Sequence, residues 1–196
     1  MDAPFRVAVF AVLATAVSIA GYHRVQAGKT RERFDRRQEG LLLAITLRLA
    51  GLAMWVGTFA YIIHPPAIGW ASVPVPDWLR WLGAVVGLAG VVLMYWTLVN
   101  LGKNLTDTVT TRRDATLVTS GPYRWVRHPF YLTAALLMAG VALLSANWFI
   151  GASGLVVMAL LVRRTPKEEQ KLVEKFGDEY RAYMAKTGRF LPRLEL

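Results

Sequence analysis

Residues 131–162 read YLTAALLMAGVALLSANWFIGASGLVVMALLV, and this run contains no charged side chain. As a single helix it would be about 48 Å long at 1.5 Å per residue, whereas the hydrocarbon core of a bilayer is about 30 Å thick. Ser145-Ala146-Asn147 lies near the midpoint of the run and is a plausible turn. We therefore expect two helices here, joined as a helix–turn–helix hairpin inside a membrane.

Three earlier runs are also long and apolar enough to cross a bilayer. They are Pro4 to Tyr22, Leu41 to Ile63 and Trp78 to Leu101. We expect the first to be a spanning helix rather than a signal peptide, because Arg6 beside Asp2 is a weak positive flank. In the third run Gly83, Gly87 and Gly90 recur at helical spacing, a pattern that lets helices approach closely in lipid.

The overall composition agrees with a membrane protein. Of the 196 residues, 55% are hydrophobic and 18% are charged, whereas soluble domains have about 45–50% and about 25%. The chain has no cysteine, which excludes disulfides, thiolate nucleophiles, cysteine zinc sites and iron–sulfur clusters. The net charge of +10 could indicate nucleic-acid binding, so the location of the charges has to decide.

Lysine and arginine are concentrated in three segments. Six lie in residues 24–40, five in 102–130 and nine from residue 163 onward, whereas 64–77 has none. Because such residues gather in cytoplasmic loops, only five crossings keep all three segments on one side. We expect an all-α, polytopic bundle of five transmembrane helices in the cell (inner) membrane, with the amino terminus out and the carboxyl terminus cytoplasmic. The net charge then reflects topology and attraction to anionic membrane lipids, and no nucleic-acid partner is expected.

The polar segment 102–130 divides the chain into three amino-terminal helices (1–101) and a candidate catalytic region (102–196). Gly121-Pro122-Tyr123 has turn composition, and Pro129 is suited to the first turn of the next helix. Arg127 and His128 are therefore expected at the membrane–water boundary. The alternative to a functional site is that this segment only anchors the chain at the membrane interface.

A second polar segment follows the hairpin. Thr165, Pro166 and Glu168 form a capping-box pattern that predicts the start of a new amphipathic cytoplasmic helix. Its apolar positions would be Leu172, Val173, Phe176, Tyr180 and Tyr183. In one interpretation the glutamates only cap and solvate this helix. In the other, five crossings place Arg164 and Glu168 on the same face as Tyr123 and His128.

The order and spacing of three motifs resemble the isoprenylcysteine carboxyl methyltransferase family, with phospholipid N-methyltransferases as relatives. The resemblance covers roughly residues 97–193. The motifs are Leu117-Val118-Thr119-Ser120-Gly121-Pro122-Tyr123, then Arg127-His128-Pro129-Phe130-Tyr131-Leu132, and finally Glu168-Glu169 with Phe176-Gly177-Asp178-Glu179-Tyr180.

The resemblance implies S-adenosyl-L-methionine as methyl donor and a set of residues that bind it. The implied cofactor-binding residues are Thr116, Leu117, Val118, Tyr123, His128, Pro129, Tyr131, Glu168 and, more weakly, Glu169. Arg164 would lie near the acceptor carboxylate, so Arg164 and His128 are the candidate catalytic residues. No metal is expected, and no Rossmann or phosphate-loop motif occurs.

The methyl acceptor stays open at this point. A lipophilic carboxylate of the isoprenylcysteine type is expected, because an ionised carboxylate needs no general base, whereas an amine must first lose a proton. The alternative acceptor is an amine, as in a phospholipid or small-amine N-methyltransferase. The alternatives to a methyltransferase are an NADPH-dependent membrane reductase of the sterol type and a non-enzymatic membrane scaffold or small carrier.

Overall fold

The computed structural model describes residues 2–28, 41–102 and 116–193. Its helices are α1 (Ala3–Gly28), α2 (Leu41–Ile63), α3 (Asp77–Leu101), α4 (Pro129–Ser145), α5 (Trp148–Phe176) and α6 (Asp178–Lys186), with two short 3₁₀ helices, η2 (Pro65–Ala71) and η4 (Gly121–Arg124). In these ranges the only strand-like pairings are two isolated bridges, Ser72 with Asn147 and Val126 with Gly188.

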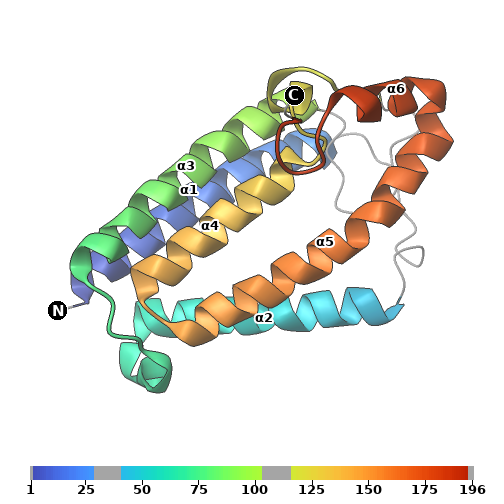
Figure 1. Ribbon diagram of the computed structural model, residues 1–196. Helices are drawn as coiled ribbons and strands as arrows, with labels where there is room; N and C mark the ends of the chain where they lie inside the picture. Colours follow the sequence, from blue (N-terminus) through green and yellow to red (C-terminus); the bar gives the residue numbers. More distant parts are fainter. Residues whose placement is uncertain (1, 29–40, 103–115, 194–196) are drawn as a thin grey trace.

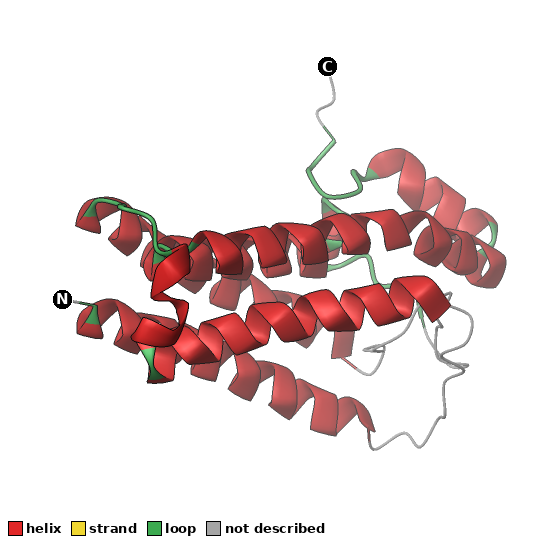
Figure 2. Cartoon of the chain, turned by 90° about the horizontal axis from the view of Figure 1, so that it is seen from below, coloured by secondary structure: helices red, strands yellow, loops and turns green. Residues whose placement is uncertain are grey.

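The long helices form two groups. Helices α1, α3 and α4 lie side by side, while α2 and α5 form a second pair beneath them (Figure 1). The same bundle seen from below is helical throughout, apart from its connecting loops (Figure 2). The α4–α5 turn joins the two groups at one end of the molecule, which we call the turn end. The opposite end, where α6 lies, is called the site end.

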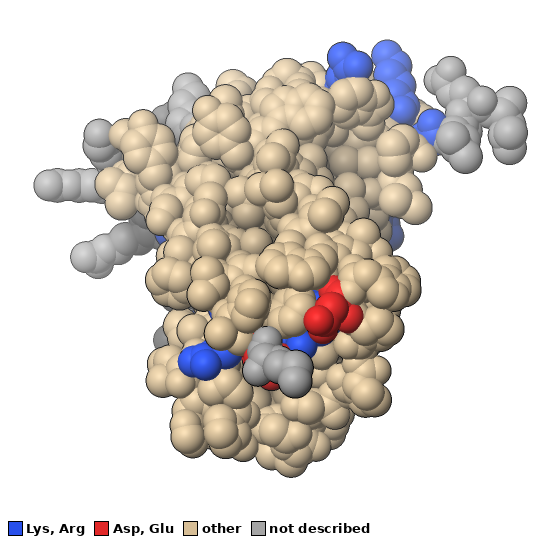
Figure 3. All heavy atoms as spheres, turned by 90° about the vertical axis from the view of Figure 1, so that its left-hand side faces the viewer, with Lys and Arg blue, Asp and Glu red and all other residues tan. Residues whose placement is uncertain are grey.

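Four helices (α1, α2, α3 and α5) are long and apolar enough to cross a membrane, and α4 is a shorter apolar helix of 17 residues. Among the described residues, an all-helical bundle with four candidate membrane spans is therefore confirmed, and α2 has the same bounds as the apolar run 41–63. Figure 3 looks at the turn end, and most of the side chains on this face are neither acidic nor basic.

Glycines bring α3 and α4 into close contact, as their spacing predicted. A Cβ placed on Gly140 of α4 would lie 2.7 Å from the Cα of Gly87, and one on Gly83 would lie 2.7 Å from the Cβ of Leu143. Neither position has room for a side chain. Close backbone approach of this kind increases van der Waals contact between helices in a solvent that supplies no hydrophobic driving force.

The predicted turn at Ser145-Ala146-Asn147 is also confirmed. Ala146 has a φ of 46°, in the left-handed region, and ends α4. Asn147 caps α5, because its Oδ1 accepts hydrogen bonds from the backbone N–H groups of Phe149 (3.1 Å) and Ile150 (3.2 Å). Its Nδ2 donates to the carbonyl oxygen of Ile68 at 3.1 Å, which fixes η2 against the turn.

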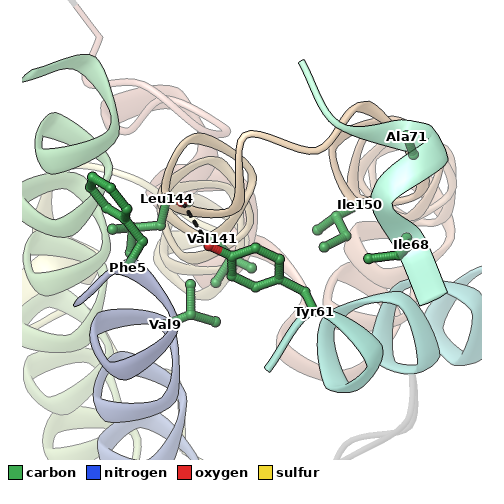
Figure 4. Close-up of a cluster of buried hydrophobic side chains, with 8 residues drawn as sticks. All are labelled: Phe5, Val9, Tyr61, Ile68, Ala71, Val141, Leu144 and Ile150. Atoms are coloured by element: carbon green, nitrogen blue, oxygen red, sulfur yellow. Dashed lines mark hydrogen bonds between the residues drawn. The ribbon is translucent and has the colours of Figure 1, made fainter. Parts of the chain in front are cut away.

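A buried apolar cluster holds the turn end together. Figure 4 shows its members, Phe5, Val9, Tyr61, Ile68, Ala71, Val141, Leu144 and Ile150, which come from both groups of helices. Arg80 of α3 lies next to it, almost fully buried. Its guanidinium donates to the Leu144 carbonyl (Nε 3.1 Å, Nη2 2.9 Å) and the Tyr61 hydroxyl (2.8 Å), and pairs with Asp2 (2.7 Å). This arginine therefore satisfies a carbonyl that the end of α4 leaves free.

The prediction of a new helix beginning at Thr165 is wrong. Helix α5 continues through Pro166 to Phe176, and Thr165 is an interior residue whose hydroxyl donates to the Leu161 carbonyl at 3.1 Å. A capping motif acts only where the preceding residues are not helical, and here seventeen helical residues come first. Proline removes one backbone hydrogen bond, whereas extending an existing helix needs no new nucleus. The helix ends later, at Phe176, and Gly177 separates it from α6.

Candidate functional site

Three segments that are distant in sequence meet at the site end of the bundle. They are residues 125–131 at the start of α4, residues 164–169 in α5, and residues 187–190 after α6. Pro129 occupies the first turn of α4, as predicted, and His128 precedes it at the cap position with φ −124° and ψ 59°. The His128 ring nitrogens lie 3.8 Å and 3.4 Å from carboxylate oxygens of Glu168 and Glu169 in α5.

Three side chains meet at the Glu168 carboxylate. Its Oε2 accepts a hydrogen bond from the Tyr131 hydroxyl at 2.7 Å and lies 3.8 Å from His128 Nδ1. Its Oε1 pairs with Arg164 Nε at 2.7 Å, one helical turn earlier. Arg164 and Glu168 expose only 12% and 16% of their side chains. Because both charged groups are largely buried away from water, their mutual attraction is stronger than that of a surface pair.

The neighbouring carboxylate, Glu169, has different partners. Oε1 accepts from Arg127 Nε at 2.8 Å, and Oε2 accepts from Arg189 Nε at 3.1 Å. Only 4% of the Glu169 side chain is exposed. His128 Nε2 lies 3.4 Å from Oε1. Two adjacent glutamates therefore face two different sets of groups.

Aromatic rings line the same region. The rings of His128 and Tyr131 stack at 5.3 Å between centroids with an interplanar angle of 14°. Phe190 packs against both rings, at 5.9 Å from His128 and 6.1 Å from Tyr131. Flat apolar surface thus adjoins the Glu168 carboxylate, a combination that suits a cation attached to an aromatic group.

Helix η4, the predicted turn at 121–123, is fixed against the end of α3. Gly121 has a φ of +57°, and a Cβ there would overlap the side-chain amide of Asn100. Ser120 Oγ donates to Asn100 Oδ1 at 3.0 Å. Two separate requirements, positive φ and close approach, thus demand glycine at this position.

Helix α6 fixes the other side of η4. The Tyr183 hydroxyl donates to the Tyr123 carbonyl at 2.6 Å. Burial raises the pKa of Tyr183 to about 12, although the charge of Arg127 opposes this shift. Burial also raises the pKa of Tyr123, and that of Tyr180 is raised by burial and by the charge of Glu169. All three phenols are therefore neutral at physiological pH.

The structure brings together some of the candidate site residues and places others nearby. His128, Pro129, Tyr131, Arg164, Glu168 and Glu169 belong to one cluster. Tyr123 lies in η4, where its backbone carbonyl is used by Tyr183. Thr116, Leu117 and Val118 lie in a non-helical stretch that leads into η4, and their role as cofactor contacts stays a prediction.

Sequence reasoning missed four residues of this region: Asn100, Arg127 as a partner of Glu169, Arg189 and Phe190. Gly188-Arg189-Phe190 follows the last helix with no periodicity to mark it. The signal that could have been used is its mixed cationic and aromatic composition, in a stretch that follows the final helix.

Comparisons with known proteins point to one family. Residues 81–174 match the model of the isoprenylcysteine carboxyl methyltransferase (ICMT) family. Protein-S-isoprenylcysteine O-methyltransferase of Homo sapiens is 31% identical over 128 residues, covering 64% of this chain and 45% of that protein. The enzyme of the same name from Xenopus laevis is 31% identical over 149 residues, covering 74% and 49%. The chain thus spans about half the length of these relatives.

A solved structure has a similar fold. It is that of the eukaryotic intramembrane Ras methyltransferase ICMT without a monobody, with a TM-score of 0.57 and 22% sequence identity, covering 94% of this chain and 67% of that one. The matched region 81–174 contains most of α3, all of η4 and α4 and most of α5, and so includes His128, Tyr131, Arg164 and both glutamates. Over residues 81–174 the chain is therefore similar to the isoprenylcysteine carboxyl methyltransferase family.

Proposed function

We propose that this protein is an integral membrane methyltransferase that transfers a methyl group from S-adenosylmethionine to the carboxylate of a lipophilic acceptor. The observation that carries the proposal is one largely buried cluster at the site end, in which Glu168 contacts His128, Tyr131 and Arg164. The match of residues 81–174 to the model of the isoprenylcysteine carboxyl methyltransferase family supports it independently. The acceptor class follows the names of the relatives, which are protein-S-isoprenylcysteine O-methyltransferases.

The residues present fit S-adenosylmethionine chemically. The cofactor is a cationic sulfonium joined to a nucleoside and an amino acid, and it supplies an electrophilic methyl group. The Glu168 carboxylate attracts positive charge, and the ring faces of His128 and Tyr131 suit a flat or cationic partner. The His128 ring is largely buried, with Nδ1 3.8 Å from Glu168 Oε2 and Nε2 3.4 Å from Glu169 Oε1, so it connects the two carboxylates beside this surface. Under this proposal Thr116, Leu117, Val118, Tyr123 and Pro129 complete the binding surface.

Methyl transfer to a carboxylate requires alignment more than proton transfer. An ionised acceptor is already nucleophilic, so the chain needs a group that orients it. Arg164 suits this role because its guanidinium is planar and can hold a carboxylate through two N–H groups. Its pairing with Glu168 limits how tightly it binds the acceptor, which preserves the acceptor's nucleophilicity.

The test is a methyl-transfer assay with methyl-labelled S-adenosylmethionine. Purified full chain in lipid nanodiscs is offered a prenylated cysteine carboxylate or a phosphatidylethanolamine, and the labelled product is treated with base. A carboxyl methyl ester loses its label in base, whereas an N-methyl group keeps it. Base-labile product from the carboxylate supports the proposal. Base-stable product from the amine would replace it with the N-methyltransferase, and no labelled product from either acceptor would contradict a methyltransferase.

We also propose five crossings, with the site end in the cytoplasm and the turn end outside. The chain has no cysteine, so a single introduced thiol reports the side on which it lies. Val73→Cys at the turn end and Ala185→Cys on α6 are both exposed positions. In intact cells an impermeant maleimide should label Val73→Cys and spare Ala185→Cys. The opposite labelling pattern would show that the site end lies outside and would contradict this topology. The proposed division of the chain at residue 101 does not depend on this result.

A further inference from the structure

We propose that residues 187–191 form one wall of the cofactor site, with Phe190 as a side chain that contacts the cofactor, and that Glu169 is a positioning residue that holds this wall in place. This inference rests on the proposed function. It changes the expectation for Glu169, since the resemblance implies direct contact between that residue and the cofactor.

Backbone hydrogen bonds attach the wall to the residues that precede α4. The N–H of Gly188 donates to the Trp125 carbonyl at 3.1 Å. In return, the N–H groups of Arg127 and His128 donate to the carbonyls of Gly188 (2.9 Å) and Arg189 (3.1 Å). The chain then turns so sharply that the Leu191 carbonyl oxygen occupies the place where a Cβ on residue 188 would lie, which is why glycine is needed there. His128 is thus directly hydrogen-bonded to the wall.

Glu169 links α5 to the same wall through two guanidinium groups. Arg127 occupies Oε1, and Arg189, a residue of the wall, occupies Oε2. Arg127 extends the link, since it also donates to the carbonyls of Met184 (3.1 Å) and Thr187. We call this set the Arg127–Glu169–Arg189 bridge. Both carboxylate oxygens of Glu169 are held by guanidinium groups, one of them from the wall itself, so its role is to hold the wall.

The bridge determines where Phe190 lies. Phe190 follows Arg189 directly, and its ring packs on the His128–Tyr131 stack at 5.9 and 6.1 Å. Phe190 is partly exposed, so part of the residue is accessible to a ligand. Any cofactor held by His128 and Tyr131 would therefore meet Phe190 at the edge of those rings. An aromatic ring at this place offers stacking to a purine and cation–π attraction to a sulfonium.

The test is calorimetric titration of the full chain, in nanodiscs, with S-adenosylhomocysteine. Phe190→Ala should weaken binding about tenfold, the factor expected for loss of one aromatic contact, and Phe190→Trp should restore it. Glu169→Gln and Arg189→Gln should each weaken binding by a similar factor. Combined, they should weaken it no further than the stronger single change, because both break one link. In turnover assays the KM for S-adenosylmethionine should rise while kcat changes less than twofold.

The control is the pair Arg181 and Asp178 on α6, an exposed ion pair near the same segment. Arg181→Gln should leave S-adenosylhomocysteine binding unchanged. If Glu169→Gln does not fold, Phe190→Ala and Arg189→Gln still test the wall. Unchanged affinity in both, with wild type binding normally, would overturn this inference and leave the proposed function standing. Failure of the wild type to bind would instead contradict the proposed function itself.

Discussion

The hydroxyl of Tyr131 in α4 donates a hydrogen bond to Oε2 of Glu168 in α5 across 2.7 Å. The two residues lie near the ends of their helices that are farthest from the α4–α5 turn. Their contact therefore closes the hairpin at the site end, while Asn147 fixes it at the turn end. The same carboxylate also pairs with Arg164, so one contact connects the fold of the hairpin with the candidate chemistry.

Replacing Glu168 should damage cofactor binding more than folding. Glu168→Gln keeps the shape of the side chain but removes the charge that Tyr131, His128 and Arg164 face. We expect S-adenosylhomocysteine affinity to fall about 10- to 100-fold, the range for a charge-assisted hydrogen bond of about 1.5–3 kcal/mol. Glu174→Gln, in the exposed Gln170–Glu174 pair of the same helix, is the matched control and should bind normally. Equal affinity in both variants would remove Glu168 from the site.

Gly121→Ala should displace η4. The substitution meets two obstacles, a φ of +57° and overlap with Asn100. Gly177→Ala isolates the first obstacle, because Gly177 has the same φ with open space around it. A non-glycine residue in such a sparsely populated conformation, here φ 57° with ψ −128°, costs about 1–3 kcal/mol, so Gly177→Ala should lower the melting temperature modestly. Gly121→Ala should lower it further and also weaken S-adenosylhomocysteine binding. Identical behaviour of the two variants would show that the contact with Asn100 has no effect.

Strongly alkaline pH should release α6 from η4. The pKa of Tyr183 is raised by burial from 10.0 to about 12, so the folded state favours the neutral phenol that donates to Tyr123. This contribution to stability is complete below pH 10 and is lost as the pH rises from about 10 to 12. Tyr183→Phe lacks it at every pH. The difference in melting temperature between wild type and variant should therefore be constant up to pH 10 and shrink above it. A difference that stays constant to pH 12 would be inconsistent with this assignment.

Arg80 should control stability at the turn end without affecting the site. Arg80→Met would leave the Leu144 carbonyl and the Tyr61 hydroxyl without their buried donor. We expect a loss of about 2–3 kcal/mol in the free energy of unfolding, as for hydrogen bonds to a charged group. Affinity for S-adenosylhomocysteine, measured well below the melting temperature, should stay at the wild-type value. A variant that is as stable as wild type, or one that loses affinity while folded, would contradict this separation of roles.

The sequence predicts the membrane helices well because bilayer thickness sets their length. The run 41–63 gave the bounds of α2 directly, and Asn147 could be recognised as a turn residue within an apolar run too long for one crossing. The close approach of α3 and α4 followed from Gly83, Gly87 and Gly90. In these cases local composition and spacing carry the information, and no distant contact is needed.

The sequence predicts less where distant contacts decide the structure. Pro166 suggested a helix start, but a helix already in progress passes through it. Motif resemblance selected Glu168 and Glu169 together, yet only the fold shows that one faces Tyr131 and the other faces Arg127 and Arg189. Phe190 could not be identified at all, because its position depends on main-chain pairing between residues 125–128 and 188–189.

The central claim is that His128 and Glu168 build a site for S-adenosylmethionine, and equilibrium titration of the purified full chain with its demethylated product, S-adenosylhomocysteine, tests it most directly. We predict saturable binding near one molecule per chain, with S-adenosylmethionine competing and NADPH failing to compete. No binding at millimolar S-adenosylhomocysteine, or displacement by NADPH, would contradict the claim.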